Sequence, residues 1–207
     1  AIDTADTRLV SQPAIGKSNI AFVYAGDLWV AGLDGKNVRR LTSGQGVSNP
    51  AFSPDGTLLA FTAPYEGNAD VYVVPVAGGV PTRLTWHPGR DTVQGFTPDG
   101  SAVVFTSGRA VFSGRYTQLF TVPVKGGFPA QVELPYAYRG VFSADGKRIA
   151  YNPLYDDFTW WKHYRGGTHS TIVLYTIATR TVEAVPQPPD RPNDVYPMWI
   201  GDTVYFV

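Results

Sequence analysis

Cysteine is absent from this chain of 207 residues, and methionine occurs only once. A chain without cysteine has no disulfide, no thiolate nucleophile and no cysteine-type zinc site. Basic and acidic residues balance at 17 each, whereas a duplex-binding domain normally has a basic face, so nucleic acid is not an expected partner. No apolar run reaches the roughly 18 residues of a membrane helix, so no membrane partner is expected either.

Turn-forming and aromatic residues are abundant instead, with 22 glycines, 17 prolines, 12 tyrosines and 11 phenylalanines. This combination favours many short strands joined by tight turns. No segment shows a sustained 3.6-residue period, which argues against helical repeats. The length suits one large all-β domain or two small ones.

One phrase recurs along the chain. Its three full copies are PAFSPDGTLLAFT (50–62), QGFTPDGSAVVFT (94–106) and RGVFSADGKRIAY (139–151). The aromatic residues Phe52, Phe96 and Phe142 lie 44 and 46 residues apart. Each copy is followed by an apolar strand and a glycine-containing hairpin, as in DVYVVPVAGGVPTRLT (70–85). Each unit therefore predicts four short strands, with the third apolar on both faces and covered on both sides.

Repeated four-stranded units of this length predict an all-β fold, a β-propeller of four-stranded antiparallel blades. A β-sandwich is the alternative, but it does not explain the recurring phrase. The expected parts are a lead-in (1–12), blades at 13–49, 50–94, 95–139 and 140–196, and the start of a further blade (197–207). The unfinished unit favours part of a larger propeller over a closed four-bladed ring.

No residue pattern typical of catalysis is found. There is no G-x-S-x-G elbow, and the histidines fall in expected loops without a recognisable nucleophile: His87, His163 and His169. The carboxylates Asp55, Asp99 and Asp145 recur at one turn position, which indicates a role in turn geometry. We therefore expect no catalytic residue, no metal site and no cofactor in this chain.

Two loops are candidates for contact with a ligand or another domain. Arg90, in WHPGR (86–90), follows a blade where the chain crosses to the next, so it either faces a channel or lies in an exposed connection. The segment 154–171 has 18 residues where the second unit has seven. Its channel or interface candidates are Trp161, Lys162, His163, Tyr164 and Arg165. A domain interface, an aromatic plug between blades and direct ligand contact all remain open for this segment.

Three stretches resemble the amino-terminal propeller of tricorn-type proteases: IAFVYAGDLWV (20–30), RLTSGQGVSNPAFSPDGTLLAFT (40–62) and WKHYRGGT (161–168). TolB-like and dipeptidyl-peptidase-like propellers share the SPDG-type repeat, whereas the WKHYRGG run is more specific. The resemblance extends over about Arg8–Val207. It implies a six-bladed propeller followed by a seven-bladed one and a catalytic region with a PDZ domain. It also implies a large homo-oligomer, cytosolic in archaea, that shortens peptides released by other proteases.

The resemblance places the catalytic residues in a carboxy-terminal region that these residues do not include. This chain would then be a non-catalytic scaffold or channel for peptide passage. Its implied partners are peptide substrates, other domains of the same chain and identical subunits. The family resemblance implies a cytoplasmic location, while the start at Ala1 leaves an exported protein open. The alternatives are a TolB-like protein-binding propeller without enzymatic activity and a propeller hydrolase of the prolyl-oligopeptidase type.

Overall fold

The computed structural model describes residues 9–44, 46–114, 116–154, 169–187 and 193–207. Across these ranges the regular structure consists of β-strands alone, with no helix. It follows that this part of the chain contains no helix long and apolar enough to cross a membrane.

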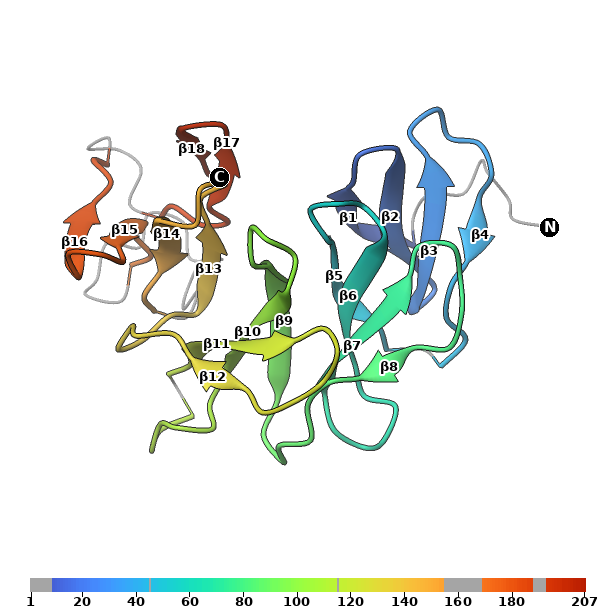
Figure 1. Ribbon diagram of the computed structural model, residues 1–207, viewed down its shortest axis with the longest axis horizontal. Coiled ribbons are helices and arrows are strands. Elements are labelled where there is room, and N and C mark those ends of the chain that lie inside the picture. The colour runs from blue at the N-terminus through green and yellow to red at the C-terminus, as the bar shows by residue number, and fades with distance from the viewer. Residues whose placement is uncertain (1–8, 45, 115, 155–168, 188–192) are drawn as a thin grey trace. The chain divides into compact units, whose positions relative to one another are not determined.

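The strands form four four-stranded sheets and one two-stranded hairpin, each made from consecutive strands (Figure 1). The first sheet contains β1 (Val10–Ile15), β2 (Asn19–Tyr24), β3 (Asp27–Gly32) and β4 (Arg39–Arg40). The second contains β5 (Ser48–Phe52), β6 (Leu58–Ala63), β7 (Asp70–Pro75) and β8 (Thr82–Arg83). The third contains β9 (Asp91–Phe96), β10 (Ala102–Ser107), β11 (Gln118–Pro123) and β12 (Ala130–Gln131). The fourth contains β13 (Arg139–Phe142), β14 (Arg148–Asn152), β15 (Val173–Thr176) and β16 (Thr181–Ala184), and the hairpin contains β17 (Met198–Ile200) and β18 (Thr203–Tyr205).

The predicted all-β fold of four-stranded antiparallel units is confirmed. The outermost strands β4, β8 and β12 are shorter than the repeat suggested, with two residues each. In the second sheet, Leu84 N still donates to Val71 O at 2.8 Å, but Val71 N then donates to the hydroxyl of Thr85 at 3.0 Å. A side chain thus replaces the next backbone rung and ends the ladder.

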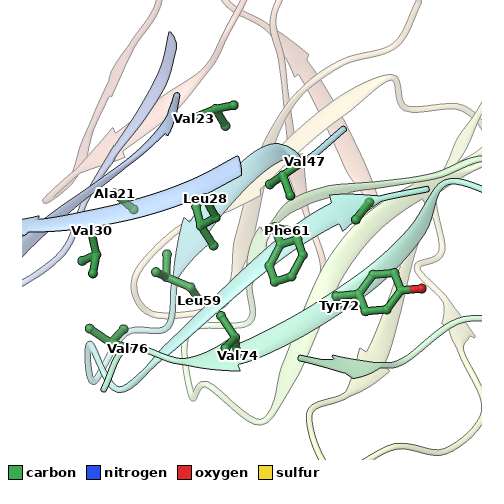
Figure 2. Packing of buried hydrophobic residues seen from close by; sticks show 11 residues of the cluster. Ala21, Val23, Leu28, Val30, Val47, Leu59, Phe61, Tyr72, Val74 and Val76 are labelled. Carbon is green, nitrogen blue, oxygen red and sulfur yellow. The ribbon is translucent and has the colours of Figure 1, made fainter. Parts of the chain in front are cut away.

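The chain divides into two compact units, Ala1–Phe105 with Val122–Pro129, and Thr106–Thr121 with Ala130–Val207. The core of the first unit lies between its first two sheets (Figure 2). Leu28 and Val30 from β3 are buried there with Leu59 and Phe61 from β6. The sequence indicated that the third strands are apolar on both faces. Their side chains are buried because other parts of the protein cover both faces.

The second unit has a separate set of buried side chains, which includes Leu119, Ile149 and Ile172, each fully buried. Gly140 in β13 lies so close to Leu119 that a Cβ atom there would come within 2.5 Å of the leucine Cδ1. The absence of a side chain at Gly140 therefore allows close packing in this unit.

Candidate functional site

Arg90 is the only predicted contact residue within the described ranges. The other five, Trp161, Lys162, His163, Tyr164 and Arg165, lie outside the described residues, so their proposed roles stay predictions. Arg90 ends the loop that joins β8 to β9 and is exposed, with Nε donating to the Thr92 hydroxyl at 3.2 Å. In the same loop, Trp86 has 62% of its surface exposed.

Asn68, in the loop between β6 and β7, holds the Arg90 loop in place. Its side-chain amide donates to the carbonyl oxygens of His87 and Gly89. Gly89 N in turn donates to Nδ1 of His87 at 2.9 Å. Because Nδ1 accepts this bond from the backbone, His87 stabilises the loop conformation.

Arg83 also stabilises the loop that contains Arg90. Its Nη2 donates to Oδ2 of Asp70 at 2.7 Å, Nη1 to Glu66 at 2.5 Å, and Nε to the carbonyl oxygen of Thr85 at 2.7 Å. Its guanidinium also lies 5.6 Å from the ring centre of Trp86, within cation–π range. The exposed tryptophan therefore rests on a side chain whose own position is fixed by three hydrogen bonds.

Asp70 is fully buried, so its charge state depends on these partners. Burial raises the pKa of Asp70, and the Arg83 guanidinium and the Thr85 hydroxyl partly oppose that rise. A carboxyl group whose pKa is raised in the folded state destabilises the fold as pH rises through the interval between its unfolded and folded pKa values. Arg83 is the main side chain that limits this cost.

The repeated turn carboxylates act on the backbone, as the sequence indicated. Oδ1 of Asp55 accepts hydrogen bonds from the Ser53 hydroxyl at 2.5 Å and from Thr57 N at 3.0 Å. Asp99 and Asp145 make the same pair of contacts in their own turns. The hydrogen bond from Ser53 contributes most to lowering the pKa of Asp55, from 3.8 to about 2. A carboxylate held in the ionised form is a poor general acid.

A feature that sequence reasoning missed lies on the first strands of the first two sheets. Gln12 and Asn49 have left-handed backbone conformations, with φ of 51° and 54°. Oε1 of Gln12 accepts a hydrogen bond of 2.6 Å from Asn49 N. The available signal was a polar residue before proline in SQPAI (11–15) and SNPAF (48–52), which the repeat comparison did not single out.

Within the described ranges, no group of three or more histidine and acidic side chains is placed to hold a metal ion. The geometry around Arg90 and the Gln12–Asn49 pair offers fixed hydrogen-bonding and aromatic groups. Such groups can contact a ligand or a protein partner without carrying out a reaction on it.

Comparison with known proteins gives a consistent result. The sequence profile of the tricorn protease N-terminal beta propeller domain matches residues 7–207. Tricorn protease homolog 1 of Streptomyces coelicolor is 34% identical over 192 residues, which cover 91% of this chain and 18% of that protein. The chain thus spans less than a fifth of this relative's length.

Solved structures give the same picture. The crystal structure of the tricorn protease superposes with a TM-score of 0.79 at 26% identity, over 96% of this chain and 20% of that one. TolB from Acinetobacter baumannii superposes with a TM-score of 0.68 at 25% identity, over 95% of this chain and 50% of that one. These matches confirm the propeller fold and the resemblance that the sequence indicated. The chain belongs to the family of tricorn protease N-terminal β-propeller domains.

Proposed function

We propose that this chain is the non-catalytic propeller portion of a tricorn-like serine peptidase, and that it forms a scaffold or channel for peptides. The main support is the match of residues 7–207 to the tricorn N-terminal propeller domain. The superposition on the tricorn protease crystal structure, which covers 96% of this chain, adds to it. Because the chain spans only about a fifth of these proteins, the proposed catalysis belongs to residues beyond this segment.

The Arg90 loop suits a contact role in such a propeller. Asn68 and Arg83 hold the loop in place, while Trp86 and Arg90 are exposed on it. Preorganised groups bind with a smaller loss of conformational entropy than flexible ones do. We propose that this loop contacts peptides or a neighbouring domain, and that Trp161, Lys162, His163, Tyr164 and Arg165 serve the same purpose in the fourth blade.

The remaining parts of the proposal follow from the family. We propose that the blades belong to a six-bladed propeller, that the parent protein is a homo-oligomer, and that it acts in the cytoplasm. Its partners would be peptide substrates and the other domains of the same polypeptide.

The decisive experiment compares the full-length protein with a form that lacks residues 7–207. We expect the full-length protein to hydrolyse oligopeptides and to lose this activity when its distal catalytic serine is replaced. We expect removal of residues 7–207 to change the dependence of the rate on peptide length. If the full-length protein hydrolyses no peptide, the peptidase assignment is wrong. An unchanged length dependence would contradict the channel role alone.

A TolB-like binding propeller without enzymatic activity is the second candidate. The superposition on TolB, with a TM-score of 0.68, favours it. It predicts a full-length protein without peptidase activity that binds a protein partner. Serine-dependent hydrolysis of peptides by the full-length protein would remove this candidate.

A further inference from the structure

The first strands of the first two sheets, β1 and β5, depart from regular β-structure at the same place. Each is an edge strand of its sheet, and the two strands lie next to each other in the first unit. Their pairing registers shift between residues 11 and 14 in β1 and between residues 48 and 51 in β5. The shifts coincide with the left-handed residues Gln12 and Asn49. Left-handed conformations are uncommon for residues other than glycine, so two at equivalent positions call for an explanation.

Proline follows the left-handed residue in both strands, as Pro13 and Pro50. An edge strand normally presents unpaired N–H and C=O groups on which an extended peptide can add as a further strand. Proline has no N–H group, and a shifted register interrupts the regular spacing of the remaining groups. The edges of β1 and β5 are therefore poorly suited to strand addition at this point.

Side-chain amides supply the hydrogen-bonding groups that the backbone lacks here. Oε1 of Gln12 accepts the bond from Asn49 N, which links β1 to β5. Within the described part of the chain, no hydrogen bond engages the amide nitrogen of Gln12 or either polar atom of the Asn49 side chain. Gln12 is exposed and Asn49 is half-buried, so these groups can reach a ligand.

We propose that Gln12 and Asn49 form a contact site for the main chain of an extended peptide. The proposal rests on the proposed channel function and gives that function a site. A primary amide has donors and an acceptor, so the Asn49 side chain can pair with a peptide N–H and C=O irrespective of the peptide sequence. Two such amides next to a proline-blocked edge bind a peptide without incorporating it into the sheet. This is the property that a passage for peptides of many sequences requires.

The backbone feature alone, a left-handed residue before proline, also occurs in the second unit, taken by itself. Tyr196 has a φ of 58° and precedes Pro197 at the start of the β17 hairpin. Its ring centre lies 3.9 Å from the guanidinium carbon of Arg139, at the start of β13. A left-handed residue before proline that contacts a neighbouring first strand therefore occurs in both units, although the first strands β9 and β13 contain no proline.

The test measures peptide binding by the full-length protein with its peptidase activity chemically inhibited. The probes are a fluorescein-labelled, uncharged peptide of alanine, glycine and serine, and the same peptide with alternate nitrogens methylated. The variant is Asn49→Gly, because glycine tolerates the left-handed backbone while the whole side chain, including its amide, is removed. The matched control is Asn37→Gly, since Asn37 is also left-handed, with a φ of 55°, but lies in the exposed β3–β4 hairpin.

We expect fluorescence anisotropy to show weaker binding of the methylated peptide by the wild type. Asn49→Gly should weaken binding of the unmethylated peptide about threefold to tenfold, as expected for the loss of one or two hydrogen bonds. It should also reduce the difference between the two peptides, and Asn37→Gly should change neither value. Asn49→Asp, which keeps the acceptor and loses the donor, should give an intermediate affinity and serves if the glycine variant does not fold.

Unchanged binding by Asn49→Gly, or no binding of the unmethylated peptide by the wild type, would overturn the contact site. Either result leaves the proposed function intact if the full-length protein hydrolyses peptides with a length dependence that requires residues 7–207. A length dependence that stays unchanged when residues 7–207 are removed would instead contradict the channel role on which this inference rests.

Discussion

At the scale of single residues, the repeated turn shows how two side chains and one glycine specify a local structure. Ser53 donates to Asp55 through its hydroxyl, and the same hydroxyl oxygen accepts from Leu58 N at 2.9 Å. Gly56 N donates to Ser53 O at 2.9 Å, the bond of a four-residue turn, and Gly56 has a φ of 79°. Only glycine adopts that conformation at little cost, which explains its place in the phrase.

This turn predicts a specific effect on titration. The lowered pKa of Asp55 contributes stability that is present above the unfolded pKa and is lost as pH falls from about 4 to about 2. Ser53→Ala should raise the pKa of Asp55 toward 3.8, because the hydrogen bond that lowers it most is removed. Carboxyl-detected NMR titration measures this shift. Ser18→Ala is the control, since that hydroxyl donates only to the neighbouring Asn19; an equal shift in both variants would contradict the prediction.

At the scale of secondary-structure elements, the first two sheets share a buried carboxylate–threonine pair with different surroundings. The Thr42 hydroxyl donates to Asp27, and the Thr85 hydroxyl donates to Asp70. Arg83 contacts Asp70 at 2.7 Å and is 15% exposed, whereas the equivalent Arg40 lies 3.8 Å from Asp27 and is 53% exposed. The two sheets thus offer a buried and an exposed version of one interaction.

Arg83→Ala should lower the free energy of unfolding by about 3 kcal/mol, because it leaves the buried Asp70 carboxylate without its cation. Arg40→Ala should cost less than about 1 kcal/mol, as exposed ion pairs do. Urea denaturation of both variants measures the two values. Equal losses would show that burial does not determine how much the Arg83–Asp70 pair contributes to the free energy of unfolding.

Phe61 tests the core between the first two sheets. It is fully buried, lies 5.8 Å from the ring of Tyr72, and belongs to the cluster shown in Figure 2. Phe61→Ala should cost about 3 to 5 kcal/mol in the free energy of unfolding because it leaves a cavity. Phe112→Ala is the control: that side chain is 96% exposed, so its loss should cost less than about 0.5 kcal/mol. A small loss for Phe61→Ala would contradict the packing described for this unit.

The sequence alone predicted much of this fold, because many of the interactions that specify it join residues close together in the chain. The turn at Ser53–Gly56 depends on side chains at most five residues apart, so the phrase itself determines it. The β6–β7 pairing follows from two apolar segments joined by a short loop. The sequence indicated that the Arg90 loop connects two repeats. The hydrogen bond from Asn68 to this loop joins residues 21 positions apart, so no local sequence pattern predicts it.

At the scale of the whole molecule, the chain is a family domain that covers about a fifth of its longer relatives. Its proposed role therefore has to be measured in the full-length parent protein. Arg90 is relevant at both scales, because it is exposed and its side chain bonds to the nearby Thr92. Its replacement should therefore affect function without affecting the fold.

Arg90→Ala in the full-length protein should change the free energy of unfolding by less than about 0.5 kcal/mol. If Arg90 contacts peptides, the variant should raise KM and leave kcat unchanged, the result expected when an interaction formed equally with substrate and transition state is lost. Steady-state peptide hydrolysis measures both constants. Lys147→Ala, at another exposed turn, is the control; the same KM in all three proteins would remove Arg90 from the contact surface.

The amino-acid sequence by itself determined the all-β class, the four-stranded repeat, the turn chemistry and the family, because each depends on residues close together in the chain or on repetition along it. Only the tertiary structure decided which polar side chains act across elements. Arg83 and Asp70 are 13 positions apart, and Gln12 and Asn49 are 37 positions apart. Their bonds form because separate strands are packed together, and no local pattern specifies which strands those will be.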